Sequence, residues 1–191
     1  RNQPLYGTLK VTAGLAGTSG NTRGRDSVVT SISNYIYQVR AIGGGRGATS
    51  GRAAEDGGSG GGGYGDSAYA YHDAGVSINC TDTLFCTADE YFGNNGADGA
   101  TVGGTLYGSG GGGAGSVGEI GGTTTGLGGS GYTLTTEFFP PSALFTSSSV
   151  ARGGSRRGLN QGYVSEVNSG DGEGEGSPAR QGFVCITYPI S

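Results

Sequence analysis

The sequence lacks tryptophan and methionine, holds one histidine and one lysine, and contains no long apolar run. No stretch approaches the roughly 20 apolar residues of a membrane-spanning helix, so no membrane insertion is expected. Net positive charge is also missing, because 11 basic and 15 acidic residues give −4. This balance argues against nucleic-acid binding. The arginine cluster Arg152, Arg156 and Arg157 is therefore interpreted as a solvated loop.

Groups that usually carry catalysis are scarce. His72 is the single histidine, and its neighbour Asp73 would point to the opposite face of a strand, so the two form no orienting pair. The glycine-rich stretch 43–48 follows a strand pattern, but no Gly-Lys-Ser/Thr element occurs, and this excludes a phosphate-binding loop of that type. The sequence predicts a protein that is not an enzyme and needs no cofactor.

Cysteines are few and unevenly spaced. Cys80 and Cys86 enclose a short segment suited to a disulfide loop, and Cys185 is predicted to be a buried free thiol on the last strand. Three cysteines and one histidine at these spacings match no zinc pattern. Asn79 begins an Asn-x-Thr sequon, which is either a glycosylation site or a chance match. With a leader expected to have been removed before Arg1, these features predict a secreted, extracellular protein.

Glycine is the residue in excess, with 45 copies among 191 residues. Two tracts, 43–65 and 93–131, carry small residues at every third position. In an extended threefold helix every third residue lies on one edge, and only glycine or alanine there lets a neighbouring backbone approach. We therefore predict packed polyglycine II-like helices, against the alternative of ordinary loops in which dense glycine gives such runs by chance. The positions are Gly45, Ala48, Gly51, Ala54, Gly57, Gly60, Gly63, Gly93, Gly96, Gly99, Gly112, Gly115, Gly118 and Gly121.

Strand patterns recur along the chain, and no segment has a sustained helical period. The clearest are 5–13, 27–33, 35–42 and 183–188, with weaker candidates at 132–139, 143–150 and 163–167. Seven or so short strands separated by turns predict an all-β fold of the β-sandwich or jelly-roll type. We expect one domain over 1–191, with 1–22 forming an N-terminal strand and a flexible arm.

One acidic pattern is a candidate cation site. Asp171, Glu173 and Glu175 alternate with glycine like the first half of a calcium loop. The twelfth position of such a loop is Gly182 here, where a bidentate acid would be needed. A solvated acidic turn is therefore the alternative to calcium.

Tyrosines at the exit of the first glycine tract are candidate ligand contacts. Tyr64, Tyr69 and Tyr71 are rigid aromatic side chains with polar tips, which suit protein or sugar surfaces. Ordinary alternation along a strand is the other interpretation.

The layout of the chain resembles that of a known group of proteins. A strand runs into Gly43-Gly44-Gly45, GGSGGGGYGD follows at 57–66, NSGDG stands at 168–172, and GFVCITY closes at 182–188. Over roughly 35–188 this resembles secreted glycine-rich β-proteins, jelly rolls whose insertions form polyglycine II helices. Related architectures occur in the glycine-rich region of some receptor tyrosine kinases and in bacteriophage tail-fibre adhesins. The resemblance implies structural, adhesive or recognition roles.

Two functions follow as expectations. The first is a structural subunit that assembles with copies of itself into a filament, sheath or coat. In that case the alternating strand with Leu5, Leu9 and Val11 pairs with a neighbouring copy by strand addition, unless it pairs within its own sheet. The second is an adhesin or receptor-binding tip that presents polar loops to glycans or a cell-surface protein.

Overall fold

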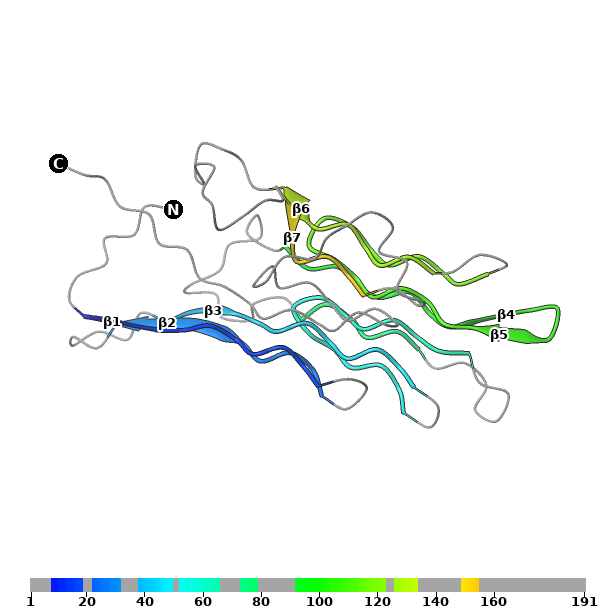
Figure 1. Cartoon of the computed structure of the whole chain (residues 1–191), viewed down its shortest axis with the longest axis horizontal. Helices are drawn as coiled ribbons and strands as arrows, with labels where there is room; N and C mark the ends of the chain where they lie inside the picture. Colours follow the sequence, from blue (N-terminus) through cyan, green and yellow to red (C-terminus); the bar gives the residue numbers. More distant parts are fainter. Residues whose placement is uncertain are drawn as a thin grey trace.

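The computed structural model describes residues 8–18, 22–31, 38–49, 52–65, 73–78, 92–122, 126–133 and 149–154. Across these ranges it contains strands and extended segments and no helix (Figure 1). The strands are β1 (Leu9–Thr12), β2 (Ser27–Ser31), β3 (Gln38–Ala41), β4 (Ala100–Val102), β5 (Thr105–Tyr107), β6 (Tyr132–Thr133) and β7 (Ser149–Val150). They form small antiparallel sheets, so the described part of the chain agrees with the predicted all-β class. The β-sandwich stays a prediction.

Strands β1, β2 and β3 form one antiparallel sheet in that order. The sequence of β2, Ser-Val-Val-Thr-Ser, is rich in the β-branched residues that favour strands. Leu9 pairs with Ser31 and Val11 with Val29. Strand β1 therefore pairs within its own sheet, which was the alternative to pairing with a neighbouring copy. Leu5 lies outside the described residues. With β1 at the rim, its outer edge has no partner strand in the described part of the chain.

A second, isolated hairpin joins β4 and β5 within the tract 93–131. Two short β-forming triplets flank Gly103-Gly104, whose φ angles are 58° and 81°. A type I′ turn needs positive φ at both central residues, and glycine adopts it without steric cost. The tract therefore contains a hairpin among its extended runs, with segment 92–99 before it and segments 108–115, 116–121 and 126–131 after it.

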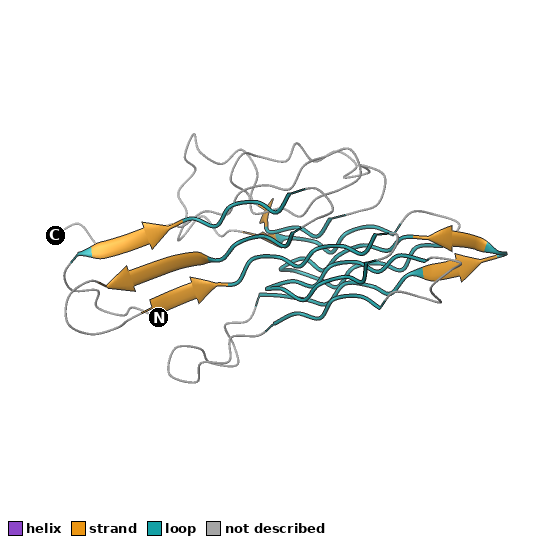
Figure 2. Cartoon of the chain, turned by 90° about the horizontal axis from the view of Figure 1, so that it is seen from below, coloured by secondary structure: helices purple, strands orange, loops and turns teal. Residues whose placement is uncertain are grey.

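Between the sheet β1–β3 and the hairpin β4–β5, extended segments run side by side (Figure 2). We call this array the glycine bundle. It comprises segments 13–18, 22–26, 42–48, 52–57, 58–65, 73–78, 92–99, 108–115, 116–121, 126–131 and 151–154. Their backbones hydrogen-bond to one another, since an extended chain has no internal partners for its N–H and C=O groups.

Hydrogen bonding in the bundle has a period of three residues. In segment 108–115, amides three positions apart donate to the same neighbour, and successive amides donate to different neighbours. Ser109 and Gly112 donate to segment 58–65, Gly110 and Gly113 to segment 116–121, and Gly111 and Ala114 to segment 151–154, each with an N···O distance of 2.9 Å. A β-strand bonds to neighbours on two sides only, so this segment is surrounded in a way that a strand is not.

The interior of the described part is made of backbone. Its buried apolar side chains are Ala97 and Val150, at 8% and 7% exposure, and no large side chain is fully buried. The other buried positions are almost all glycine, including 60–63 and 110–113. Apolar burial therefore contributes little here, and hydrogen bonds with close backbone packing carry the bundle.

Glycine is required in the bundle because a Cβ atom would not fit. A Cβ at Gly60 would lie 1.8 Å from the carbonyl oxygen of Gly75, and one at Gly45 would lie 2.0 Å from that of Glu55. Among the glycines described, only Gly103 and Gly104 have φ in the left-handed region, so conformational freedom is not the reason elsewhere. The expectation that only every third glycine is crowded is too narrow. At Gly61 a Cβ would meet backbone at 2.0 Å, because segment 58–65 has neighbours on several sides.

Candidate recognition site at the loop end

Four pairs of described segments end toward the same end of the bundle as the turn of the hairpin β4–β5 (Figure 1). Their ends are residues 18 and 22, 49 and 52, 65 and 73, and 122 and 126, and the residues between the two ends of each pair lie outside the described ranges. Hydrogen bonds fix this common direction. Gly65 donates to the carbonyl of Tyr107 (3.2 Å), and Gly121 donates to Oγ of Ser109 (2.8 Å). We call this region the loop end.

Polar contacts join two of these pairs of segment ends. Thr49 and Arg52 exchange two backbone hydrogen bonds of 3.0 Å. Thr18 and Thr22 approach through their hydroxyls at 3.1 Å, and the Thr22 hydroxyl also accepts a hydrogen bond from the Thr18 amide (3.1 Å). In both pairs the two ends are thus held to each other.

The hairpin β4–β5 is the outermost described element of the loop end (Figure 2). Residues 101–105 are all exposed, and Val102 is 43% exposed. This tip offers two threonine hydroxyls, one valine and a glycine turn, and it has no charge. Such a surface suits hydrogen bonding to a neutral polar ligand and does not suit strong ion pairing.

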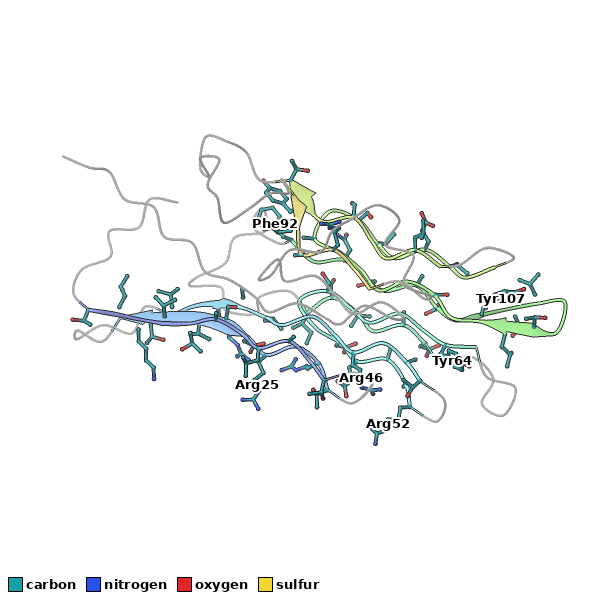
Figure 3. The ribbon with its side chains drawn as sticks, in the orientation of Figure 1. Arg25, Arg46, Arg52, Tyr64, Phe92 and Tyr107 are labelled. Carbon is teal, nitrogen blue, oxygen red and sulfur yellow. The ribbon has the colours of Figure 1, made fainter. Side chains whose placement is uncertain are left out.

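The predicted contact residue Tyr64 lies at the base of the hairpin. Its backbone forms an antiparallel bridge with Gly108, next to Tyr107 of β5, and its side chain is half-buried (Figure 3). Tyr107 was missed by the sequence-based choice, although the triplet Thr-Leu-Tyr after Gly-Gly was a strand signal. Tyr69 and Tyr71 belong to the same predicted group and lie outside the described residues.

Side chains replace backbone acceptors where segment 73–78 meets its neighbours. The amides of Ala74 and Ser77 donate to Oδ1 of Asp98 and Asn95, each at 2.8 Å. These donors are three residues apart, and so are their acceptors, which matches the period of the bundle. The amide of Val76 donates to Oδ1 of Asp56 at 2.8 Å. The carboxylates of Asp98 and Asp56 are thus engaged in holding backbone amides of segment 73–78.

At the opposite side, Asp26 joins the sheet to the bundle. Its carboxylate accepts hydrogen bonds from the Gly43 amide (2.8 Å) and from Nε of Arg40 (2.6 Å). Partial burial opposes ionisation, but the Gly43 amide and the Arg40 guanidinium outweigh it and hold the pKa of Asp26 below its ordinary value. The positive charge of Arg23 acts in the same direction on that pKa.

One expectation about charge is wrong. Arg152 is not solvated but buried, with 9% exposure. Its segment, 151–154, lies against segments 108–115 and 126–131, to which it is hydrogen-bonded. Arg156 and Arg157 fall outside the described residues.

Most other predicted site residues cannot be placed. Asn79, Cys80, Cys86, Cys185, His72, Asp171, Glu173 and Glu175 all lie outside the described ranges. The disulfide, the sequon and the calcium loop therefore stay predictions. In the part of the chain that is described, no three His, Cys, Asp or Glu side chains gather as metal ligands. The same residues include no helix that could cross a bilayer.

In comparisons with protein-family models, curated proteins and solved structures, nothing matched this chain. The arguments below therefore depend on the geometry alone.

Proposed function

We propose that the chain is a non-enzymatic extracellular recognition module, in which a polyglycine II-like bundle presents loops at one end to a glycan or a cell-surface protein. The observation that carries this proposal is that four pairs of segment ends and the exposed turn of the hairpin β4–β5 lie together at the loop end. Binding residues are commonly found on loops that a rigid scaffold positions.

The construction of the bundle supports this role. Its segments are held by backbone hydrogen bonds between glycines, so the scaffold does not depend on which side chains the loops carry. Loop sequence can then change without repacking a core, because the described core holds almost no side chains. This separation of scaffold from loops is useful in a protein whose binding surface must match a particular target.

The loop end also has suitable chemistry. Threonine hydroxyls and half-buried tyrosines provide hydrogen bonds and rigid aromatic surface at low entropic cost. The uncharged tip of β4–β5 favours neutral sugars or a polar protein surface over highly charged ligands.

Binding of the intact chain to a glycan array and to cells from its native environment tests the proposal. We expect the loop-end variant Val102→Glu/Thr105→Glu to lose binding while keeping its melting temperature. The matched control Val11→Glu/Thr12→Glu makes the same change in net charge at exposed residues of β1, at the other end, and should bind normally. Binding that survives in the loop-end variant and fails in the control would refute the loop end as the contact surface.

Self-assembly is the second candidate, and one observation favours it. The outer edge of β1 and of the segment that continues it is open in the described structure, with Val11 46% and Leu15 54% exposed. Open strand edges pair readily with further strands. Filaments seen by negative-stain microscopy, and abolished by Val11→Lys, would support a filament, sheath or coat subunit. Discrete particles at high concentration would speak against it.

A further inference from the structure

One side of the glycine bundle exposes apolar side chains beside carboxylates. It is formed by segments 73–78, 92–99, 116–121 and 126–131, which hydrogen-bond to one another in that order with N···O distances of 2.9–3.1 Å. Each of them also bonds inward to segment 58–65 or segment 108–115, which contain the buried glycines. The four segments therefore line one side of the bundle, which we call the acidic–apolar face.

The exposed side chains of this face include large apolar groups and acids. The apolar ones are Val76, Phe92, Val117, Ile120 and Leu127, of which Ile120 is the most exposed, at 67%. Phe92 also contacts the exposed ring of Tyr132, which follows segment 126–131, with 4.7 Å between ring centroids. The four segments contain three acidic residues, all exposed, and no basic residue: Asp73, Asp98 and Glu119. A contiguous exposed apolar surface of this kind marks an interaction site.

The opposite edge of the bundle is apolar and basic. There β1, segment 13–18 and its neighbour 22–26 form the rim of the chain (Figure 1), which we call the N-terminal edge. The Arg25 amide donates to the carbonyl of the exposed Leu15 (2.9 Å), so the two residues lie side by side. The exposed Arg25 side chain points away from the bundle (Figure 3), and no carboxylate of the described residues pairs with it. Arg23, on the same segment, is exposed as well.

The two surfaces are complementary in charge, and the whole sequence follows the same division. Residues 1–54 contain seven basic residues and one acidic residue, whereas the rest of the chain contains four basic and fourteen acidic residues, which completes the totals of 11 and 15. Apolar exposure is divided in the same way. Apart from Val102 at the loop end, every exposed large apolar residue of the described ranges lies on the acidic–apolar face, on the adjoining Tyr132 or on the N-terminal edge.

We infer that the acidic–apolar face binds the N-terminal edge of a second copy of this chain. The apolar side chains of both surfaces are then removed from water, and the carboxylates of one copy face the arginines of the next. Segments 42–48 and 58–65 lie between the two surfaces within one copy, so the contact forms between copies. Because it joins two different surfaces, it repeats into an open chain of copies unless the rotation closes a ring. This inference rests on self-assembly, the second candidate function, and does not involve the loop end.

Sedimentation velocity of the full chain over a concentration series tests the contact. We expect association that weakens with added salt, because opposite charges contribute to it. The face variant Val117→Lys/Ile120→Lys and the edge variant Val11→Asp/Leu15→Asp each replace apolar contacts by charge of the repelling sign. Each should weaken association at least about tenfold. All four residues are exposed, so both variants should keep the native melting temperature.

An equimolar mixture of the face variant and the edge variant gives the sharpest result. Each variant keeps one intact surface, so the mixture should form one-to-one dimers that grow no further. The matched control Val102→Lys/Thr105→Lys makes the same change in net charge as the face variant, but at the loop end, and should associate as the native chain does.

Three outcomes would overturn the inference: a native chain that is monomeric at every concentration, a mixture that stays monomeric, or an equal loss in the control. A fourth outcome separates this inference from self-assembly itself. If the face variant associates like the native chain and the edge variant does not, the N-terminal edges pair with each other. Self-assembly would then stand, and the role of the acidic–apolar face would be refuted.

Discussion

The sheet β1–β3 and the glycine bundle solve the same hydrogen-bonding problem in different ways. In the sheet, each strand bonds within one plane, and side chains alternate between two faces. In the bundle, the amides of segment 108–115 donate to three neighbouring segments, and its carbonyls accept from two more, 92–99 and 126–131. Little room is left there for side chains, and at Gly110, Gly112 and Gly113 a Cβ would lie within 2.2 Å of a neighbouring backbone. In the sheet, the face on which a residue lies decides which side chains are accepted at its position. In the bundle, the deciding factor is whether the position has room for a Cβ atom.

The largest expected effect tests that difference directly. Replacing Gly60 by valine should destabilise the fold by about 3 kcal/mol or more, because even a Cβ would lie 1.8 Å from the Gly75 carbonyl oxygen. Gly45→Ala should also destabilise it strongly, since its Cβ would lie 2.0 Å from the Glu55 oxygen. Chemical denaturation of each variant measures the free energy of unfolding.

Gly44 supplies the control, one residue away on the same segment. A Cβ there meets nothing within 4 Å, and the position is exposed. Gly44→Ala should change the free energy of unfolding by less than about 0.5 kcal/mol. If Gly44→Ala and Gly45→Ala were equally stable, the segments would not be packed as described.

The next effect concerns the rare side chains inside the bundle. Ser109 is 8% exposed, donates to the carbonyl of Asp98 (2.5 Å) and accepts from the amide of Gly121 (2.8 Å). Ser109→Ala would leave both groups buried without that partner and should destabilise the fold by about 2 kcal/mol. The exposed Ser130 serves as the control, and Ser130→Ala should cost clearly less in the same denaturation experiment. Equal losses would mean that burial of Ser109 is unimportant.

How far the sequence predicted this structure differs between the two regions. The strand patterns at 27–33 and 35–42 predicted strands where β2 and β3 lie, because strand patterning is local, but they did not predict how the strands pair. The threefold spacing of Gly45, Gly57 and Gly60 indicated close packing. The partners of those glycines, such as Gly75 and Glu55, could not be predicted, because dense glycine leaves no side-chain pattern to set the register.

The loop end was only partly predictable from the sequence. Tyr64 was selected because it stands at the exit of a glycine tract, which is a local feature. Which segment ends lie together at the loop end depends on how the segments stack, and no local pattern shows that. The hairpin at Gly103-Gly104 was readable, since two β-forming triplets flank a Gly-Gly turn. It was overlooked within a tract interpreted as a single type of structure. The burial of Arg152 had no local signal, because surrounding glycines gave no apolar environment to recognise.

The boundary between the two regions gives a pH-dependent prediction. The pKa of Asp26 is lower in the folded state than the ordinary value near 3.9 that it has when unfolded. Its stabilisation should therefore be complete above about pH 5 and should disappear as the pH falls through the folded pKa. Asp26→Asn should lower stability by about 1 kcal/mol at pH 7 and remove this part of the acid dependence. An unchanged acid limb in urea titrations of the variant would contradict the assignment.

The smallest expected effect is a gain, and it tests whether glycine is also favoured in the bundle for its backbone freedom. Ala151 has φ of 56°, a left-handed conformation that a Cβ makes unfavourable, and its carbonyl accepts the Ala114 amide at 2.9 Å. Ala151→Gly removes that strain while keeping the hydrogen bond, and its cost in unfolded-state entropy is smaller. We expect a net stabilisation of at most about 1 kcal/mol, or a rise in melting temperature of about 2–4 °C. Ala114→Gly is the control, because Ala114 has no positive φ and should lose stability with the same substitution. A melting temperature that falls in both variants would show that the backbone at position 151 is not strained.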